Sequence, residues 1–216
     1  MALLLPARPK LQRGHHAAMP YSAVPAFFQS VGSLDSISAD ALSFLILTVA
    51  RTGEVRGATW REVDAVAKIW TIPAERMKAG REHRVPLSEA AMEVLRRMAE
   101  IAPEGAARAA AFVFPGAMSD RPLSVMALAM CLRGLDPSAT VHGFRSSFRD
   151  WAGNETYFAR EIMEQALAHR VGDSTELAYR RSDALDKRRK LMDARATYVS
   201  AEKSGNVVPF STNATA

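Results

Sequence analysis

The sequence predicts an α+β fold that is mostly α-helical and carries one small antiparallel sheet. Apolar residues recur at intervals of three and four over several segments of ten residues or more, the period of an amphipathic helix. Two short segments, 66–72 and 83–87, instead have the character of strands, and the glycine-containing stretch between them predicts a β-hairpin with a long tip. Hydrophobic residues make up 48% of the 216 residues, which favours a globular chain with a sizeable core.

The predicted helices follow from this periodicity and from the residues that interrupt it. Leu42, Leu45 and Ile46 define a helix over 38–51, and Gly53 breaks it before a short helical turn over 54–58. After the hairpin, further helices are predicted over 88–102, 124–134, 141–153, 158–169, 175–181 and 184–201.

The ends of the chain differ from its middle. Three prolines and several basic residues within 1–20 predict an extended basic arm or linker, and the globular domain is expected to span 21–202. The polar tail, 203–216, is predicted to be disordered. No apolar run reaches the length of a membrane span, and no signal peptide is evident, so a cytoplasmic protein without membrane contact is expected.

Charge favours an anionic partner. Lysines and arginines number 28 against 23 acidic residues, a formal net charge of +5. Such a balance is typical of proteins that bind nucleic acid, although many soluble domains carry a similar charge for no special reason. The single cysteine, Cys131, lies in an apolar stretch and is expected in the core. The five histidines and this cysteine have no zinc-site spacing, so no metal or other cofactor is expected.

His142 and Arg145 form the first candidate site. Residues three apart share a helix face, so the two side chains could grip one phosphate while Phe144 points into the core. The histidine could also move a proton. The spacing often arises by chance, and the alternative is an ordinary surface pair.

Two further candidates lie earlier in the chain. Arg56 follows the break at Gly53, where a rigid turn could preorganise it to bind an anion. Lys78 lies on the hairpin tip between Arg76 and Arg81, and three cations on a tip suit a nucleic-acid groove. The alternatives are solvent-exposed basic residues.

Tyr179 is the fourth candidate. It comes ten residues after His169 and is followed by Arg180 and Arg181. Neighbouring cations favour the phenolate form and a phosphate partner. The alternative is a tyrosine at the edge of the core.

Taken in chain order, these residues resemble the tyrosine recombinase, or phage integrase, family, and most closely the integrases of prophages and genomic islands. The resemblance runs from Tyr21 to Val199 and implies the helical catalytic-domain fold of that family. Each motif is weak alone, but five in the right order and spacing are specific. They are RTGEVRGATW, WTIPAERMKAGREHRVPLS, FVFPG, HGFRSSFRDWA and ALAHRVGDSTELAYRRSDALDKRRKLMDARATYV.

The resemblance implies a role for each candidate. Arg56 and Arg145 would clamp the scissile phosphate, and His142 and His169 would complete its binding. Tyr179 would attack phosphorus to give a 3′-phosphotyrosine. The remaining expected roles are Lys78 as general acid on the 5′ oxygen, and Arg76, Arg81, Arg149, Arg180 and Arg181 as DNA contacts.

The resemblance also implies double-stranded DNA as partner, a homo-oligomer on DNA that is tetrameric at synapsis, and chemistry that uses neither metal nor ATP. One position departs from the family. Many members carry an acidic residue three positions after the first arginine, and counted from Arg56 that position is Thr59, with Glu54 and Glu62 nearby.

Three alternatives stay open. A metal-dependent transposase of the ribonuclease H type needs clustered carboxylates on a mixed sheet, which this chain lacks. A DNA-binding fragment without recombination activity is consistent with the short stretch before residue 20, because relatives carry an extra DNA-binding domain there. A type IB topoisomerase shares the chemistry and would relax DNA without strand exchange. The last helix is expected to dock either on its own domain or on a neighbour.

Overall fold

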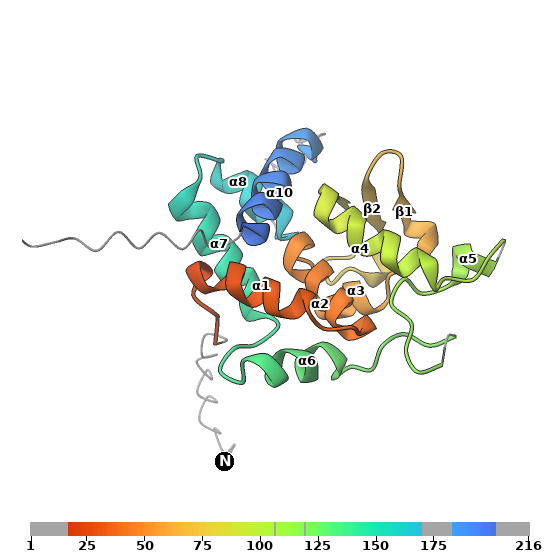
Figure 1. The fold of residues 1–216 in the computed structure, drawn as a ribbon. Helices are drawn as coiled ribbons and strands as arrows, with labels where there is room; N and C mark the ends of the chain where they lie inside the picture. The colour runs from red at the N-terminus through yellow and green to blue at the C-terminus, as the bar shows by residue number, and fades with distance from the viewer. Residues whose placement is uncertain (1–16, 106, 119, 170–182, 202–216) are drawn as a thin grey trace, which may run out of the picture.

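The computed structural model describes residues 17–105, 107–118, 120–169 and 183–201. Within these residues the fold is mostly helical with one three-stranded antiparallel sheet, as the sequence predicts (Figure 1). The elements are α1 (Val24–Gly32), α2 (Ile37–Thr48), α3 (Thr52–Arg56), β1 (Val63–Asp64), β2 (Ile69–Ile72), β3 (His83–Pro86), α4 (Glu89–Glu100), α5 (Ala107–Ala110), α6 (Ala127–Leu135), α7 (Gly143–Glu155), α8 (Arg160–Ala166) and α10 (Leu185–Ser200), with 3-10 turns at Tyr21–Ala23, Trp60–Glu62 and Ala74–Arg76.

Helix α2 is the centre of the larger of two apolar cores. The Ser36 hydroxyl accepts a hydrogen bond from the backbone N–H of Ala39 at 3.2 Å and caps its start. Residues 41–48 are all buried, so the helix is enclosed on every side. Helices α1, α4, α6 and α10 pack around it (Figure 1). Phe44 links it to the sheet through Trp70, with ring centroids 5.3 Å apart.

The sheet has the order β1-β2-β3, and β2 pairs with β3 over four residues as the predicted hairpin requires. The predicted strand over 66–72 begins only at Ile69. Asp64 is the reason: its Oδ1 accepts the backbone N–H groups of Val66 and Ala67 at 3.0 and 2.8 Å, which bends the chain into a turn. The short strand β1 before this turn was not predicted.

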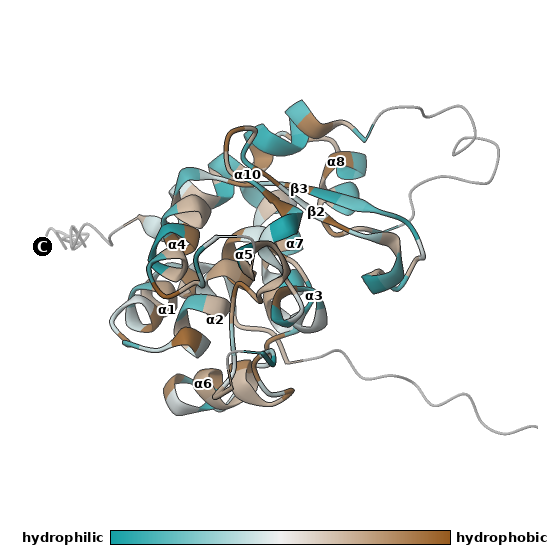
Figure 2. Cartoon of the chain, turned by 90° about the vertical axis from the view of Figure 1, so that its right-hand side faces the viewer, coloured by the Kyte–Doolittle hydropathy of each residue, from teal (hydrophilic) through white to brown (hydrophobic). Residues whose placement is uncertain are grey.

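Helices α7, α8 and α10 enclose a second core around Phe148, Trp151 and Leu191. The outer face of α4, by contrast, carries the charged residues of its amphipathic pattern, and Figure 2 shows this hydrophilic stripe turned to the surface. Figure 2 also shows the hairpin strands running out between α8 and α3. The buried apolar residues of the hairpin, such as Trp70 and Val85, belong to the larger core around α2.

The predicted helices over 38–51, 54–58, 88–102, 124–134, 141–153, 158–169 and 184–201 are confirmed, with boundaries shifted by a few residues. Helix α1 was not predicted, because its apolar residues are spread over only nine positions. The predicted helix 175–181 and the tail 203–216 lie outside the described residues.

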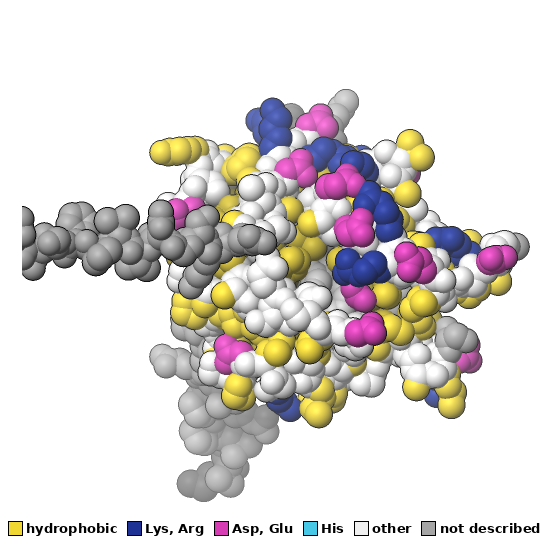
Figure 3. Space-filling view, in the orientation of Figure 1, with side chains coloured by type: hydrophobic (Ala, Val, Ile, Leu, Met, Phe, Trp, Pro, Cys, Tyr) yellow, Lys and Arg dark blue, Asp and Glu magenta, His cyan; other side chains and the backbone are white. Residues whose placement is uncertain are grey.

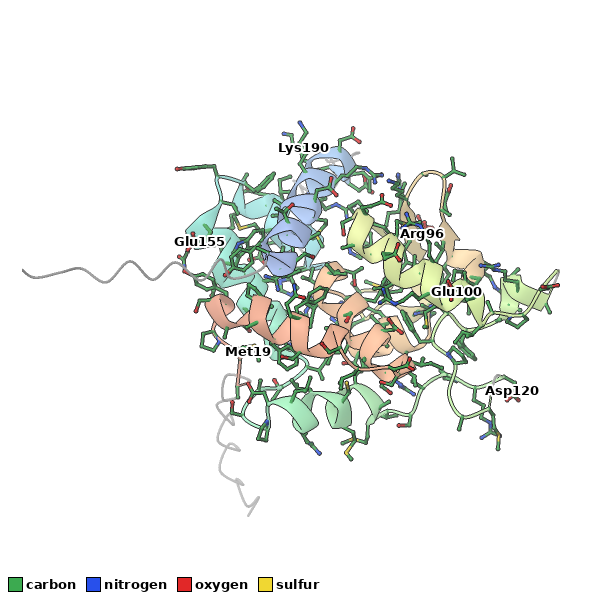
Figure 4. All side chains as sticks on the ribbon, viewed as in Figure 1. Met19, Arg96, Glu100, Asp120, Glu155 and Lys190 are labelled. Carbon is green, nitrogen blue, oxygen red and sulfur yellow. The ribbon has the colours of Figure 1, made fainter. Side chains whose placement is uncertain are left out.

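The packed body also begins before Tyr21, where the sequence suggested an extended arm up to residue 20. Met19 is buried below the start of α1 (Figure 4), and its carbonyl accepts a hydrogen bond from Ser147 of α7. The Ala17 carbonyl accepts two hydrogen bonds from Thr140, at 2.9 and 3.1 Å. Residues 17–20 are thus fixed to α7 by backbone hydrogen bonds that no local sequence pattern indicates.

Candidate active site

Arg145 is the centre of the candidate site. It lies in the first turn of α7 and only 5% of it is exposed. Its guanidinium donates to the carbonyl of Val49, which follows α2, and to the carbonyl of Leu167, which follows α8, at 2.5 Å for the latter. One buried cation therefore joins the ends of two helices and is held in one orientation.

The environment of Arg145 sets its charge. Burial lowers its pKa to about 10. The positive charge of Arg51 lowers the pKa in the same direction, whereas the carboxylates of Glu54 and Glu164 act against this shift. At neutral pH the guanidinium remains protonated, so it can bind an anion.

Val49 has an unusual backbone conformation beside this arginine. Its φ of 52° lies in the left-handed region, which costs energy for a β-branched residue. The bond from Arg145 to its carbonyl stabilises this turn. The turn ends α2 and directs the next two residues, Ala50 and Arg51, into the site.

Arg51 is held there by Glu54. One oxygen of the buried Glu54 carboxylate accepts from the Arg51 backbone N–H at 2.7 Å, and the other accepts from the Arg51 guanidinium at 2.7 Å. Because Arg51 is also an electrostatic neighbour of Arg145, the structure brings two arginines together. Arg51 was not among the candidates, although a signal was present: an acidic residue follows it by three positions.

Arg56 is engaged by a different part of the chain. Its Nε donates to the carbonyl of Leu123 at 2.7 Å, which ties the end of α3 to the segment before α6. The arginine whose charge acts on Arg145 is Arg51, and the carboxylate three residues after it, Glu54, is its acidic partner.

His169 lies beside Arg145 in the structure. Its Nε2 lies 3.3 Å from Nη2 of Arg145, and its Nδ1 lies 2.6 Å from the carboxylate of Glu164. Burial alone would raise the pKa of Glu164, but hydrogen bonds from His169 and Arg149 outweigh it and lower the pKa. The ionised carboxylate orients the imidazole so that Nε2 faces the arginine.

His142 is the N-cap residue of α7, three residues before Arg145. It is exposed, whereas Arg145 is buried, so the two side chains lie in different environments. Phe144 is buried in the core, which confirms that part of the prediction.

The hairpin residues divide into inward and outward sets. Arg76 turns inward: it contacts both oxygens of Glu62 at 2.5 and 2.6 Å and donates to the carbonyl of Glu54. It thereby joins the hairpin to the turn that holds Arg51. Lys78 and Arg81 are exposed at the tip.

Four other predicted residues have different outcomes. Arg149, predicted to contact DNA, pairs with Glu164 at 2.7 Å. Tyr179, Arg180 and Arg181 lie outside the described residues. Across the described part of the chain, no group of three metal-ligating side chains is close enough to hold an ion, and none of its helices is long and apolar enough to cross a bilayer.

The fold agrees with comparisons to known proteins. The family model described as the phage integrase family matches residues 22–185. This chain belongs to the phage integrase family of tyrosine recombinases.

Several curated integrases are similar in sequence. Prophage integrase IntZ of Escherichia coli (strain K12) is 35% identical over 200 residues, which cover 91% of this chain and 48% of the relative. Prophage integrase IntA of the same strain is 36% identical over 166 residues, 76% of this chain and 39% of the relative. The chain thus spans about half the length, or less, of these relatives.

Solved structures share the fold at low identity. The integrase from mycobacterium phage Brujita superposes with a TM-score of 0.59 at 16% identity, over 84% of this chain and 59% of the other. The XerA recombinase superposes with a TM-score of 0.56 at 14% identity, over 80% of this chain and 63% of the other.

Proposed function

We propose that this chain is the strand-cutting domain of a site-specific DNA recombinase, and that Tyr179 is its nucleophile. The observation that carries the proposal is the arrangement around Arg145, a buried cation fixed by two backbone carbonyls beside His169 and Arg51. Its match to the phage integrase family supports the same reading.

The phosphate would be bound by Arg51 and Arg145. As phosphorus is attacked, negative charge builds on the two non-bridging oxygens, and preorganised cations stabilise it. Arg145 is fixed by carbonyls and Arg51 by Glu54, so neither side chain must be reorganised during the reaction. This assignment replaces Arg56, whose guanidinium is bonded to the carbonyl of Leu123.

The histidines would complete the binding of the phosphate. His169, oriented by Glu164, has its Nε2 close to Arg145 and is proposed to donate a hydrogen bond to a phosphate oxygen. His142, exposed three residues before Arg145, would do the same from the DNA side.

The chemistry would be an exchange of one phosphodiester for another. The Tyr179 phenol releases its proton to water and its oxygen forms a bond to phosphorus, while the bond from phosphorus to the 5′ oxygen breaks. Lys78 gives a proton to that leaving oxygen. The product is a 3′-phosphotyrosine that keeps the energy of the broken bond. A 5′ hydroxyl from another strand can reverse the step, so rejoining needs neither ATP nor, with these cations present, a metal ion.

Double-stranded DNA is the proposed partner, and an oligomer assembled on DNA, a tetramer at synapsis, would provide the second strand. The face over α4 and α10 in Figure 3 alternates basic and acidic side chains, such as Arg96 with Glu89 and Glu93. Mixed charge does not favour a polyanion, so DNA would approach the site and the hairpin tip instead. Arg81 would contact the backbone there, as would Arg180 and Arg181.

A second candidate is a domain that binds DNA without cutting it, which the exposed cations Lys78 and Arg81 at the hairpin tip would suffice to support. Phosphate contacts alone would give weak binding that weakens steeply with salt.

A suicide-substrate assay separates these functions. Nicked duplexes tiled across both ends of the genetic element that encodes the chain are incubated with protein in EDTA, and adducts stable to SDS are measured. We expect an adduct with the unmodified chain and none with Tyr179→Phe. Salt-sensitive binding without an adduct would support the second candidate, and an adduct that persists in Tyr179→Phe would refute the assigned nucleophile. Plasmid relaxation without strand exchange would indicate a topoisomerase.

A further inference from the structure

Arg188 is a fully engaged buried arginine outside the phosphate-binding cluster. It lies in the first turn of α10 with 2% of its surface exposed. Its Nη1 donates to the carbonyl of Arg84 at 2.6 Å, its Nε to the carbonyl of Asp183 at 2.8 Å, and its Nη2 to the carboxylate of Asp183 at 2.9 Å. One guanidinium therefore bonds strand β3 to the start of α10.

The adjacent residue strengthens the same contact. Arg189 donates to the carbonyls of Lys68 and Ala67, at 3.2 and 3.0 Å, in the turn that leads into β2. Because β3 is an edge strand, its outer backbone groups need partners outside the sheet, and Arg188 of α10 supplies one for the carbonyl of Arg84. The start of α10 thus holds both strands of the hairpin.

The hairpin is held on its other side by the active site. Arg76, at the base of the tip, donates to the carbonyl of Glu54. His83, the first residue of β3, faces the charges of Arg188, Glu54 and Arg51. Contacts on both sides therefore set the position of the tip relative to Arg51 and Arg145. The buried contact on the α10 side is the bond from Arg188 to the hairpin.

We propose that Arg188 is a positioning residue for proton delivery: by bonding Arg84 to Asp183 it fixes the hairpin so that Lys78 can protonate the leaving 5′ oxygen. Lys78 is six residues from Arg84, so the bond from Arg188 to the Arg84 carbonyl anchors the strand that directly follows the tip. The inference rests on the proposed function, since it assumes that Lys78 is the general acid.

A substrate with an activated leaving group tests this role. A 5′-bridging phosphorothiolate releases a thiolate, which leaves without a proton, so it tolerates the loss of a general acid. For Arg188→Met we expect cleavage of ordinary DNA to fall about 10- to 100-fold, because a misplacement near 1 Å can cost that much. Cleavage of the phosphorothiolate by Arg188→Met should fall less than about threefold. Lys78→Ala should behave in the same way, with slow cleavage of ordinary DNA because the general acid is missing, and nearly normal cleavage of the phosphorothiolate.

Matched variants make the outcome decisive. Lys190→Met changes a cation two residues away that points outward from α10 (Figure 4), and it should cleave both substrates like the unmodified chain. Arg145→Ala should reduce the cleavage of both substrates to the same extent. If Arg188→Met fails to fold, as judged by its thermal transition, Asp183→Ala removes the bond to the carboxylate and should show the same rescue to a smaller degree.

Equal losses on both substrates, or no loss, would overturn the role of Arg188 while leaving the proposed function intact. If the unmodified chain cleaves neither substrate, the proposed function itself fails.

Discussion

Arg51 and Arg56 lie five residues apart, yet they are in different surroundings. Arg51 is anchored by a buried carboxylate beside Arg145, whereas Arg56 is bonded to a loop carbonyl. At the scale of the residue, function depends on which of two similar side chains is oriented toward the site.

Substituting each arginine distinguishes them. Arg51→Ala is expected to lower the rate of covalent adduct formation about 10²- to 10³-fold, the typical cost of losing one preorganised donor to a developing charge. Arg56→Ala should lower that rate less than about tenfold and reduce the free energy of unfolding by about 1 kcal/mol, since one hydrogen bond to Leu123 is lost. Adduct kinetics and urea unfolding measure both effects. A greater loss of adduct in Arg56→Ala would restore Arg56 to the phosphate-binding pair.

Arg195 is a buried cation of a different kind. It is fully enclosed among Phe148, Trp151 and Tyr198, and all three of its guanidinium nitrogens lack hydrogen-bond partners within the described residues. Burial lowers its pKa to about 9. Among the described residues it is the faces of aromatic rings that compensate this charge, so we expect it to destabilise the native state at neutral pH.

Arg195→Met is therefore expected to raise the free energy of unfolding by about 1–2 kcal/mol, because an unpaired buried charge is replaced by an apolar side chain of similar length. Urea unfolding at pH 7 measures the change. Loss of stability in this variant would mean that a buried partner satisfies the guanidinium in solution.

At the scale of the element, helix α7 has one position that tolerates no side chain. A Cβ at Gly143 would lie 2.8 Å from Cα of Ala18 and still closer to the carbonyl oxygen of Ala17. Both obstacles are backbone atoms of the segment that crosses the start of the helix. The glycine lets residues 17–20 lie directly against α7, next to Arg145.

Gly143→Ala should therefore displace that segment and reduce the free energy of unfolding by about 1–3 kcal/mol, the usual cost of overpacking. Gly153→Ala in the same helix is the matched control. A Cβ there meets nothing within 4 Å, so alanine should stabilise the helix by about 0.5–1 kcal/mol. Urea unfolding together with hydrogen exchange of the segment before α1 would test both, and equal effects would contradict the close contact.

At the scale of the whole molecule, His83 lies where the hairpin, α3, α8 and α10 meet. Burial lowers its pKa to about 4 from 6.5, and the charge of Arg188 acts in the same direction. Glu54 and a hydrogen bond to the backbone of Ala166 oppose the shift, whereas Arg51 adds to it. The native state therefore holds a neutral imidazole among groups from every part of the fold.

The free energy of unfolding should accordingly decrease as the pH is lowered. Above pH 6.5 the histidine is neutral in both states and has no effect, but between pH 6.5 and 4 the unfolded chain takes up a proton that the folded chain does not. The free energy of unfolding should decrease over this window by at most about 3 kcal/mol. His83→Gln should remove this contribution, as urea unfolding from pH 7 to 4 would reveal. A variant with the same pH dependence as the unmodified chain would rule it out.

Local sequence determined much of this protein. Periodicity in segments such as 41–46 fixed the helices, and the alternation on either side of the hairpin tip fixed β2 and β3, because these features depend on neighbours within a few residues. The spacing of His142, Arg145 and His169 identified the family, and His169 and Arg145 do meet.

Only the tertiary structure decided the surroundings of each arginine, and the proposed roles rest on those surroundings. Arg145 donates to the carbonyl of Val49, 96 residues away and two residues before Arg51. Arg76 donates to Glu62, and Arg188 donates to the carbonyl of Arg84 in β3, 104 residues away. An arginine in a sequence has the same charge wherever it lies. Its role is set by desolvation and by the carbonyls and carboxylates that folding brings to it from distant segments.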